Sequence, residues 1–135
     1  MPSYEEIRIG DKASFTKTIS ESDVYQFAGI TGDFNPVHVN SEFANQTIFK
    51  ERIAHGLLTA GFISAVLGMK LPGPDTIYLS QKVDFKSPVK IGDTITAEVE
   101  VLEKKDPKKI IRLRTIVKNH LDVIVIDGEA VVKKW

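Results

Sequence analysis

The sequence predicts an α+β fold in which an antiparallel sheet wraps around one long central helix. Two observations indicate this class: an apolar segment at residues 54–69, and alternating apolar and polar residues in four runs between residues 77 and 132. A sheet with one apolar face needs a cover, which the apolar helix can provide. Because 135 residues fit one domain, we expect a single domain over residues 1–135.

The segment that precedes the apolar helix carries weaker signals. Residues 7–19 hold short extended pieces around a Gly-Asp turn, and the first half can add another strand to the sheet. Ser20 is followed three residues later by Asp23, which is the pattern of a capping box. This pattern predicts a helix over residues 21–29.

The next signals lead into the central helix. Residues 31–39 are predicted as a loop because they contain Gly-Asp and Asn-Pro turn signals, and residues 41–45 as a short helical turn. Residues 54–69 read as one helix with apolar residues all round its axis, which predicts burial on most sides. One stripe has mostly small side chains that could approach a backbone or a ligand closely. It comprises Leu57, Ala60, Gly61, Ser64 and Gly68.

The second half changes to a period of two, which is typical of strands. The four runs lie around residues 77–85, 94–101, 111–118 and 124–132. Turn signals stand at Ser87-Pro88, Gly92-Asp93, Asp106-Pro107 and Asn119–Asp122. Four consecutive strands joined by short turns predict an antiparallel sheet.

Composition excludes several classes of protein. The absence of cysteine excludes disulfide scaffolds, thiolate nucleophiles and cysteine-based metal sites, and three scattered histidines argue against an all-histidine metal site. Basic and acidic residues balance at 18 each, whereas nucleic-acid binders usually carry a basic excess. The apolar segment is too short and too polar for a membrane span, and the charged N-terminus lacks a signal-peptide core. We therefore expect a soluble, cytoplasmic protein that binds neither nucleic acid nor membrane.

Polar residues in the predicted loop could carry out acid–base chemistry. Pro36 fixes its own φ and holds Asn35 extended, which stiffens the loop that bears Asp33 and His38. A stiff loop can hold a carboxylate and an imidazole near one point, where they would orient a water and move its protons. Taken alone, such a pair is more often a turn-stabilising aspartate and a surface histidine.

The start of the apolar helix is a second candidate. Backbone amides at a helix N-terminus lack acceptors and carry partial positive charge, and Gly56 leaves its amide accessible. This amide could stabilise an oxyanion such as a thioester enolate, although a helix start with a packed His55 explains the same residues. Ser64 either donates a hydrogen bond into a pocket or bonds back to its own helix. Gln81 is either a satisfied core amide or a pocket residue.

Taken together, these segments resemble a known family. Gly-Asp-Phe-Asn-Pro-Val-His-Val-Asn at residues 32–40, followed by Ala-His-Gly-Leu-Leu at residues 54–58, is similar to the hydratase motif of the MaoC-like family of (R)-specific enoyl-CoA hydratases and dehydratases. The resemblance spans nearly the whole chain, with no departure at the motif positions. Further agreement lies at residues 9–11, 72–74, 77–81, 85–89 and 92–93.

This resemblance implies a hot-dog fold, in which a sheet wraps a long central helix, and a homodimer. It implies a hydro-lyase that reversibly hydrates trans-2-enoyl-CoA to (R)-3-hydroxyacyl-CoA. Neither a metal nor a redox cofactor is implied, and coenzyme A is only part of the substrate. Asp33 and His38 would be the catalytic pair, with Asp33 favoured as the base, and the Gly56 amide would be the oxyanion hole. Substrate-binding or site-shaping roles fall to Asn35, His55 and Ser64.

Three alternatives stay open at this point. A hot-dog acyl-CoA thioesterase shares the oxyanion site at the helix start, but the paired Asp33 and His38 favour hydration. A non-catalytic acyl-binding partner subunit of a dehydratase is disfavoured by the intact motif. Finally, an acyl carrier protein could replace coenzyme A, and the sequence does not indicate acyl chain length.

Overall fold

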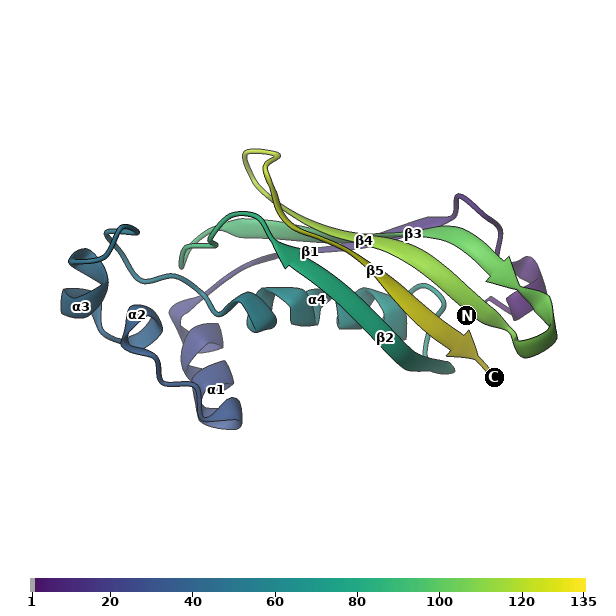
Figure 1. The fold of residues 1–135 in the computed structure, drawn as a ribbon, viewed down its shortest axis with the longest axis horizontal. Helices are drawn as coiled ribbons and strands as arrows, with labels where there is room; N and C mark the ends of the chain where they lie inside the picture. The colour runs from purple at the N-terminus through teal and green to yellow at the C-terminus, as the bar shows by residue number, and fades with distance from the viewer. Residues whose placement is uncertain (1) are drawn as a thin grey trace.

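The computed structural model describes residues 2–135 and shows a five-stranded antiparallel sheet curved over one long helix (Figure 1). The strands are β1 (Lys12–Thr18), β2 (Thr76–Phe85), β3 (Thr94–Lys105), β4 (Ile110–Asn119) and β5 (Ile124–Lys134). The helices are α1 (Glu21–Thr31), α2 (Pro36–Val39), α3 (Ser41–Asn45) and α4 (Gly56–Met69), with 3₁₀ turns at Tyr4–Glu6 and Asp106–Lys108. The α+β class is therefore confirmed, and β1 is the additional strand of the first half.

The core lies between α4 and the inner face of the sheet. Ile63, Val66 and Leu67 of α4 are almost fully buried and belong to one apolar cluster with the strands. Strand β3 follows the predicted alternation most clearly. Its buried residues are Ile95, Ala97, Val99 and Val101, and the residues between them are only partly covered. Each fully buried Val, Leu or Ile contributes about 1.5–3 kcal/mol, which holds the sheet on the helix.

Helix α4 begins two residues later than predicted. His55 occupies the N-cap position with extended backbone angles, and Ala54 donates its backbone N–H to the Val89 carbonyl at 2.7 Å. Residues 54–55 therefore belong to an extended approach that is tied to the segment after β2. This approach places His55 beside the first turn of the helix.

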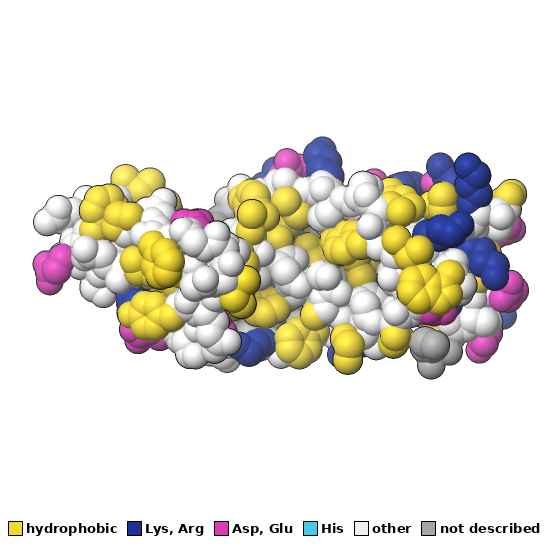
Figure 2. Space-filling model, turned by 90° about the horizontal axis from the view of Figure 1, so that it is seen from below, with side chains coloured by type: hydrophobic (Ala, Val, Ile, Leu, Met, Phe, Trp, Pro, Cys, Tyr) yellow, Lys and Arg dark blue, Asp and Glu magenta, His cyan; other side chains and the backbone are white. Residues whose placement is uncertain are grey.

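The prediction of burial on most sides of α4 is confirmed, because one side is exposed in the single chain and the other sides are buried or partly buried. Leu57, Gly61 and Ser64 lie on the exposed side. Figure 2 views the molecule from below, the side on which α4 lies in Figure 1, and hydrophobic side chains gather at this surface. The sheet is too narrow to surround the helix completely.

The strand order is β1-β3-β4-β5-β2, so β2 pairs with β5 and not with β3, which follows it in the chain. The edges of the sheet are thus β1 and β2. On β2 the predicted apolar stripe is not buried, because Ile77, Leu79 and Phe85 are 38%, 49% and 53% exposed. The β1 edge is polar, and Lys70 Nζ donates to the Ser14 carbonyl there at 2.5 Å.

Strands β2 and β5 approach each other closely at Gly128. A Cβ atom at this position would lie 1.9 Å from the Lys82 carbonyl oxygen, a distance that no packed atom can occupy. Glycine is therefore required for this pairing of the edge strand.

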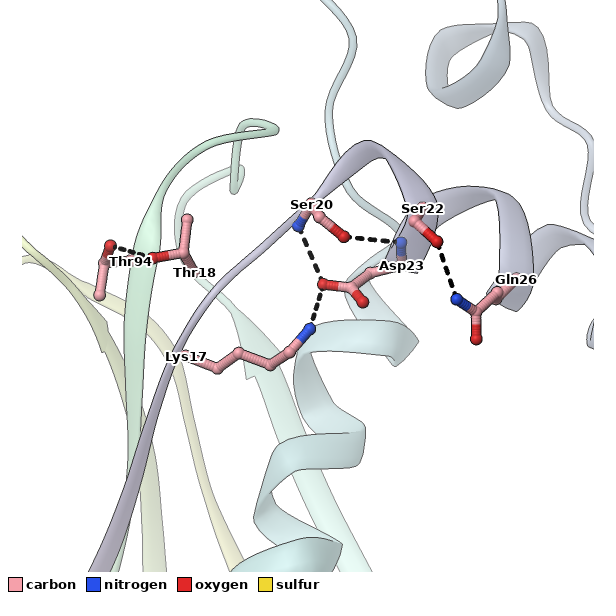
Figure 3. Close-up of polar contacts among 7 residues, drawn as sticks. All are labelled: Lys17, Thr18, Ser20, Ser22, Asp23, Gln26 and Thr94. Carbon is pink, nitrogen blue, oxygen red and sulfur yellow. Dashed lines mark hydrogen bonds and ion pairs between the residues drawn. The ribbon is translucent and has the colours of Figure 1, made fainter.

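Helix α1 begins with the predicted capping box (Figure 3). Ser20 Oγ accepts the Asp23 N–H at 3.0 Å, and the Asp23 carboxylate accepts the Ser20 N–H at 2.9 Å. Lys17 of β1 forms an ion pair with the same carboxylate, which ties the strand to the helix. The helix runs two residues further than predicted, to Thr31, and ends at Gly32 with φ 82°.

Residues 31–39, predicted as a loop, are only partly a loop. Pro36–Val39 form the single helical turn α2, because Asn35 Oδ1 accepts the Val37 N–H at 3.1 Å and proline suits the first helical position. The predicted helical turn at Ser41–Asn45 is confirmed as α3. Within residues 2–135, no helix is long and apolar enough to cross a membrane.

Candidate active site

A cavity of about 510 Å³ is bounded by the N-terminal end of α4, the segment after β2 and the loop that follows α1. Its lining includes Asp33, His38, His55, Gly56, Phe85 and Lys86. Four of the six residues predicted for the site therefore meet at one cavity. The other two, Asn35 and Ser64, do not line it.

Asp33 is exposed and lies in the short loop between α1 and α2. Its N–H donates to Thr31 Oγ1 at 3.2 Å, and its Oδ1 accepts the Asn35 N–H at 3.2 Å. Because Asn35 also caps α2, it shapes the loop without lining the cavity. The loop thus presents a carboxylate whose position is set by its own neighbours.

His38 on α2 is buried, with 8% of its surface exposed, and is not the surface histidine that the isolated pattern would give. Its Nδ1 lies 2.7 Å from the Ile53 carbonyl oxygen. A carbonyl oxygen can only accept, so Nδ1 carries the proton of the neutral ring and Nε2 keeps its lone pair. Burial lowers the pKa of His38 below its usual 6.5, and the nearby His55 ring adds to this effect, while the Ile53 bond and Asp33 oppose it. His38 is therefore a neutral hydrogen-bond acceptor near pH 7.

His55 lies between two rings. Its ring stacks on His38, with centroids 3.9 Å apart and planes at 29°, and lies 4.7 Å from the Phe27 ring centroid. Its Nε2 is 2.9 Å from the backbone carbonyl oxygen of Asp33. His55 therefore contacts both members of the predicted pair, through the backbone of Asp33 and the ring of His38.

Gly56 is the first residue of α4, where backbone N–H groups lack intrahelical acceptors and the helix dipole is positive. A Cβ atom on Gly56 would lie 2.7 Å from Cε1 of Phe85, so glycine allows the ring to approach the helix start. Phe85 thus forms a wall of the cavity beside the Gly56 backbone. This position suits stabilisation of an oxyanion.

Comparison with known proteins assigns the family. The model of the MaoC like domain matches residues 6–122. This chain belongs to the MaoC-like domain family. It is 54% identical over 129 residues to an (R)-specific enoyl-CoA hydratase of Rhodospirillum rubrum. The aligned region covers 96% of this chain and 89% of that protein. An (R)-specific enoyl-CoA hydratase of Aeromonas caviae is 41% identical, over 97% of this chain and 98% of that protein.

A solved structure confirms the predicted hot-dog fold of this MaoC-like chain. The unliganded R-hydratase of Pseudomonas aeruginosa matches it with a TM-score of 0.93 at 48% identity. The match covers 97% of this chain and 84% of that chain. The sheet that curves over α4 is the corresponding architecture here.

The structure of this MaoC-like chain also shows where two other polar candidates, Ser64 and Gln81, lie. Ser64 is exposed on α4 and stands outside the cavity of this single chain. Gln81 is half-buried on the sheet, and its Nε2 donates to Thr115 Oγ1 at 2.9 Å and to the Lys82 carbonyl at 2.8 Å. It is a satisfied amide and does not line the cavity.

Donor atoms of Asp33, His38 and His55 lie within 4.8 Å of one another, which raises the question of a metal. The imidazole lone pairs lie in the ring planes, and two stacked planes do not direct them toward one point. One nitrogen of each ring is also bonded to a backbone carbonyl. The arrangement suits hydrogen bonding to a small polar molecule better than chelation of an ion.

Three features of the site were not predicted: the Ile53 carbonyl, the Phe27 ring and the Phe85 ring. Ile53 forms an isolated bridge with Lys90, so its role depends on a contact remote in sequence. Phe85 was assigned only to the apolar stripe of its strand. The family-like segment at residues 85–89 was the one signal that could have linked it to the site.

Proposed function

We propose that this protein is an (R)-specific enoyl-CoA hydratase, a hydro-lyase that reversibly adds water to trans-2-enoyl-CoA and forms (R)-3-hydroxyacyl-CoA. The observation that carries the proposal is the meeting of Asp33, His38 and Gly56 at one cavity. The substrate class and the hand of the product are supported by the (R)-specific hydratases that are 54% and 41% identical.

Gly56 activates the acyl group in this proposal. The thioester carbonyl accepts a hydrogen bond from the Gly56 N–H at the positive end of α4. This bond makes C3 more electrophilic and stabilises the enolate oxygen that forms when water attacks. The Phe85 ring packs beside this backbone and forms one wall of the cavity in which the acyl group would lie.

Asp33 and His38 hold the attacking water. Because His38 Nδ1–H is bonded to Ile53, its Nε2 accepts one hydrogen of the water, and the Asp33 carboxylate accepts the other. Asp33 takes its proton as the water oxygen attacks C3. The resulting carboxylic acid delivers that proton to C2, and the second hydrogen stays on the new hydroxyl group.

We expect this chemistry to need neither a metal ion nor a redox cofactor, and coenzyme A to act only as the handle of the substrate. The Asp33 carboxylate is sufficient for the proton transfers, which such a group accelerates by about 10²–10⁴-fold, while the neutral His38 ring holds the water. The stacked arrangement of the His38 and His55 rings, which does not direct their lone pairs toward one point, supports this expectation.

A homodimer formed along β2 is part of the proposal. The β2 edge carries the exposed Ile77, Leu79 and Phe85, and unpaired strand edges readily pair with another chain. Leu57 on the exposed side of α4 lines the same cavity as Phe85 and adds to the apolar surface near this edge. Light scattering on the purified protein would test the dimer, and the cytoplasmic location stays a prediction that cell fractionation would test.

The decisive experiment mixes the purified protein with crotonyl-CoA and follows loss of the conjugated enoyl absorbance. An (R)-specific dehydrogenase then reports the hand of the alcohol. Rapid hydration to the (R)-alcohol, lost in both Asp33→Asn and His38→Ala, is the expected result.

Other outcomes separate the alternatives. Release of free thiol without hydration would indicate a thioesterase. If the folded protein fails with crotonyl-CoA, longer enoyl-CoA esters, enoyl thioesters of an acyl carrier protein and addition of a catalytic partner chain follow. Failure of all three would show that the proposed activity is wrong.

A further inference from the structure

The histidine at the start of α4 has features that neither the acid–base pair nor the oxyanion site requires. His55 is buried, with 2% of its surface exposed, although its ring holds two polar nitrogens. One nitrogen, Nε2, is bonded to the Asp33 carbonyl at 2.9 Å. The other, Nδ1, is buried without a hydrogen-bond partner among the described residues.

These contacts select one protonation state. The Asp33 carbonyl oxygen can only accept, so Nε2 must carry a proton. A second proton on Nδ1 would place a donor in a buried position without an acceptor, which is unfavourable. It would also place a cation against the stacked His38 ring, 3.9 Å away between centroids. The neutral ring with its proton on Nε2 satisfies all of these conditions.

The same ring joins the three helices that build the site. Phe27 comes from α1, His38 from α2 and His55 from the N-cap of α4, and the His55 ring contacts both of the other rings. Figure 1 shows α1 and α2 near the N-terminal end of α4, and the Lys17–Asp23 ion pair also ties α1 to β1. Neighbouring bonds fix this end, because Ile53 accepts from His38 and the Thr59 N–H donates to the His55 carbonyl at 3.2 Å.

We propose that His55 is a positioning residue that works as an uncharged ring. Its Nε2–H donates to the Asp33 backbone carbonyl and its face stacks on the His38 ring, so that the Asp33 carboxylate and the His38 imidazole both bind the same water. This inference rests on the proposed hydratase function. Glutamine can reproduce the N–H donor without the stacked ring, and phenylalanine can reproduce the ring without the donor. Histidine supplies both at once.

Kinetics of two variants test the role. In His55→Phe the Asp33 loop loses its anchor, so we expect kcat for crotonyl-CoA to fall by about 10–100-fold, with KM changed less than about threefold, because small misplacements cost this much. His55→Gln keeps an N–H within reach of the Asp33 carbonyl and should regain about tenfold of that loss. The matched control is His120→Gln, because His120 is an exposed histidine in the turn between β4 and β5 and should leave kcat unchanged.

Several outcomes would overturn the proposal. A His55→Phe variant with wild-type kcat would show that the anchor is unnecessary. A loss confined to KM would make His55 a substrate-binding residue, and a glutamine variant no better than phenylalanine would remove the donor role. A lower melting temperature with unchanged kcat would reduce His55 to a packing residue.

The ring protonation state can be read in the unsubstituted protein, so the test does not depend on a variant that folds. The chain has only three histidines, which makes ¹⁵N-labelled imidazole spectra simple to assign. We expect His55 to be neutral with its proton on Nε2, and His38 neutral with its proton on Nδ1, at pH 7. A proton on His55 Nδ1 at that pH would overturn the proposal. If the protein fails to hydrate enoyl thioesters, the proposed function fails, whereas these spectra still decide the state of His55.

Discussion

Replacing Gly56 with alanine should slow hydration by displacing the oxyanion amide while the protein stays folded. The new Cβ atom would lie 2.7 Å from Cε1 and 2.9 Å from Cδ1 of Phe85. Phe85 lines the cavity and is not part of the buried core, so its ring can move toward the cavity and the fold can survive. The cost therefore falls on alignment at the start of α4.

The magnitude follows from the overlap. Ordinary contact begins near 3.4 Å, so ring and helix start must separate by the difference from 2.7 Å, about 0.7 Å. Misplacement by about 1 Å can cost roughly 100-fold in rate. We therefore expect kcat to fall by about 10–100-fold, equivalent to about 1.4–2.7 kcal/mol in activation free energy.

The assay measures initial rates of crotonyl-CoA hydration, with thermal unfolding in parallel. Gly29→Ala is the matched control, because a Cβ on Gly29 in α1 meets no atom within 4 Å. That substitution should leave kcat unchanged and stabilise the helix by about 0.5–1 kcal/mol. The double variant Gly56→Ala with Phe85→Leu removes the ring edge and should regain part of the lost rate.

A Gly56→Ala variant with wild-type kcat would refute the reasoning that a Cβ atom at this position displaces the oxyanion amide. If the double variant were no faster than Gly56→Ala, the loss would not arise from the Phe85 contact, and the magnitude worked out above would be wrong.

The remaining predictions concern the pair, pH, metal removal and the sheet. Asp33→Asn should lower kcat by about 10²–10⁴-fold in the crotonyl-CoA assay, and a smaller loss would show that Asp33 does no acid–base work. His38→Ala should lower kcat by about 10–100-fold because the attacking water loses one of its two acceptors, and an unchanged kcat would show that His38 does not hold this water. Because the pKa of His38 lies below its usual 6.5 and the neutral ring is the acceptor, kcat/KM should fall on acidification with a midpoint below pH 6.5; a pH–rate profile with its acid midpoint at or above 6.5 would contradict this. EDTA treatment followed by gel filtration should leave the rate unchanged, and a loss restored by a divalent metal would reverse the assignment. Gly128→Ala should destabilise the protein by about 3 kcal/mol in urea unfolding, since its Cβ would meet the Lys82 carbonyl oxygen at 1.9 Å; a loss below about 1 kcal/mol would mean that β2 shifts freely.

The sequence predicted best the elements that depend on residues close together in the chain. The Ser20 and Asp23 pair fixed the start of α1, and the alternation in residues 94–101 matched the buried face of β3. The loop at residues 31–39 was misjudged, because Asn35 and Pro36 act as helix-start residues as well as turn residues. The pairing of β2 with β5 and the exposure of one side of α4 depend on how the whole sheet is arranged around the helix. No pattern of neighbouring residues predicts that arrangement.

The candidate site divides in the same way. Asp33 and His38 are close in the sequence with Pro36 between them, so their proximity could be predicted, although His38 lies on α2 and not in a loop. The position of Gly56 could be predicted from the helix start. The donor state of His38 could not be predicted, because it depends on the Ile53 carbonyl across a tertiary contact. The burial of His55 between two rings likewise arises only when α1, α2 and α4 come together.

The two edges of the sheet also limit how many copies of the chain could join through strand pairing. Two copies joined through β2 would turn both outer edges of the combined sheet into β1, since each copy has only these two edges. The β1 edge holds Lys12 and Lys17, and Lys70 already occupies the Ser14 carbonyl. Charged side chains along an edge discourage further pairing. Assembly by strand addition would therefore be self-limiting at two copies, which protects a protein with an apolar edge from forming open-ended fibrils.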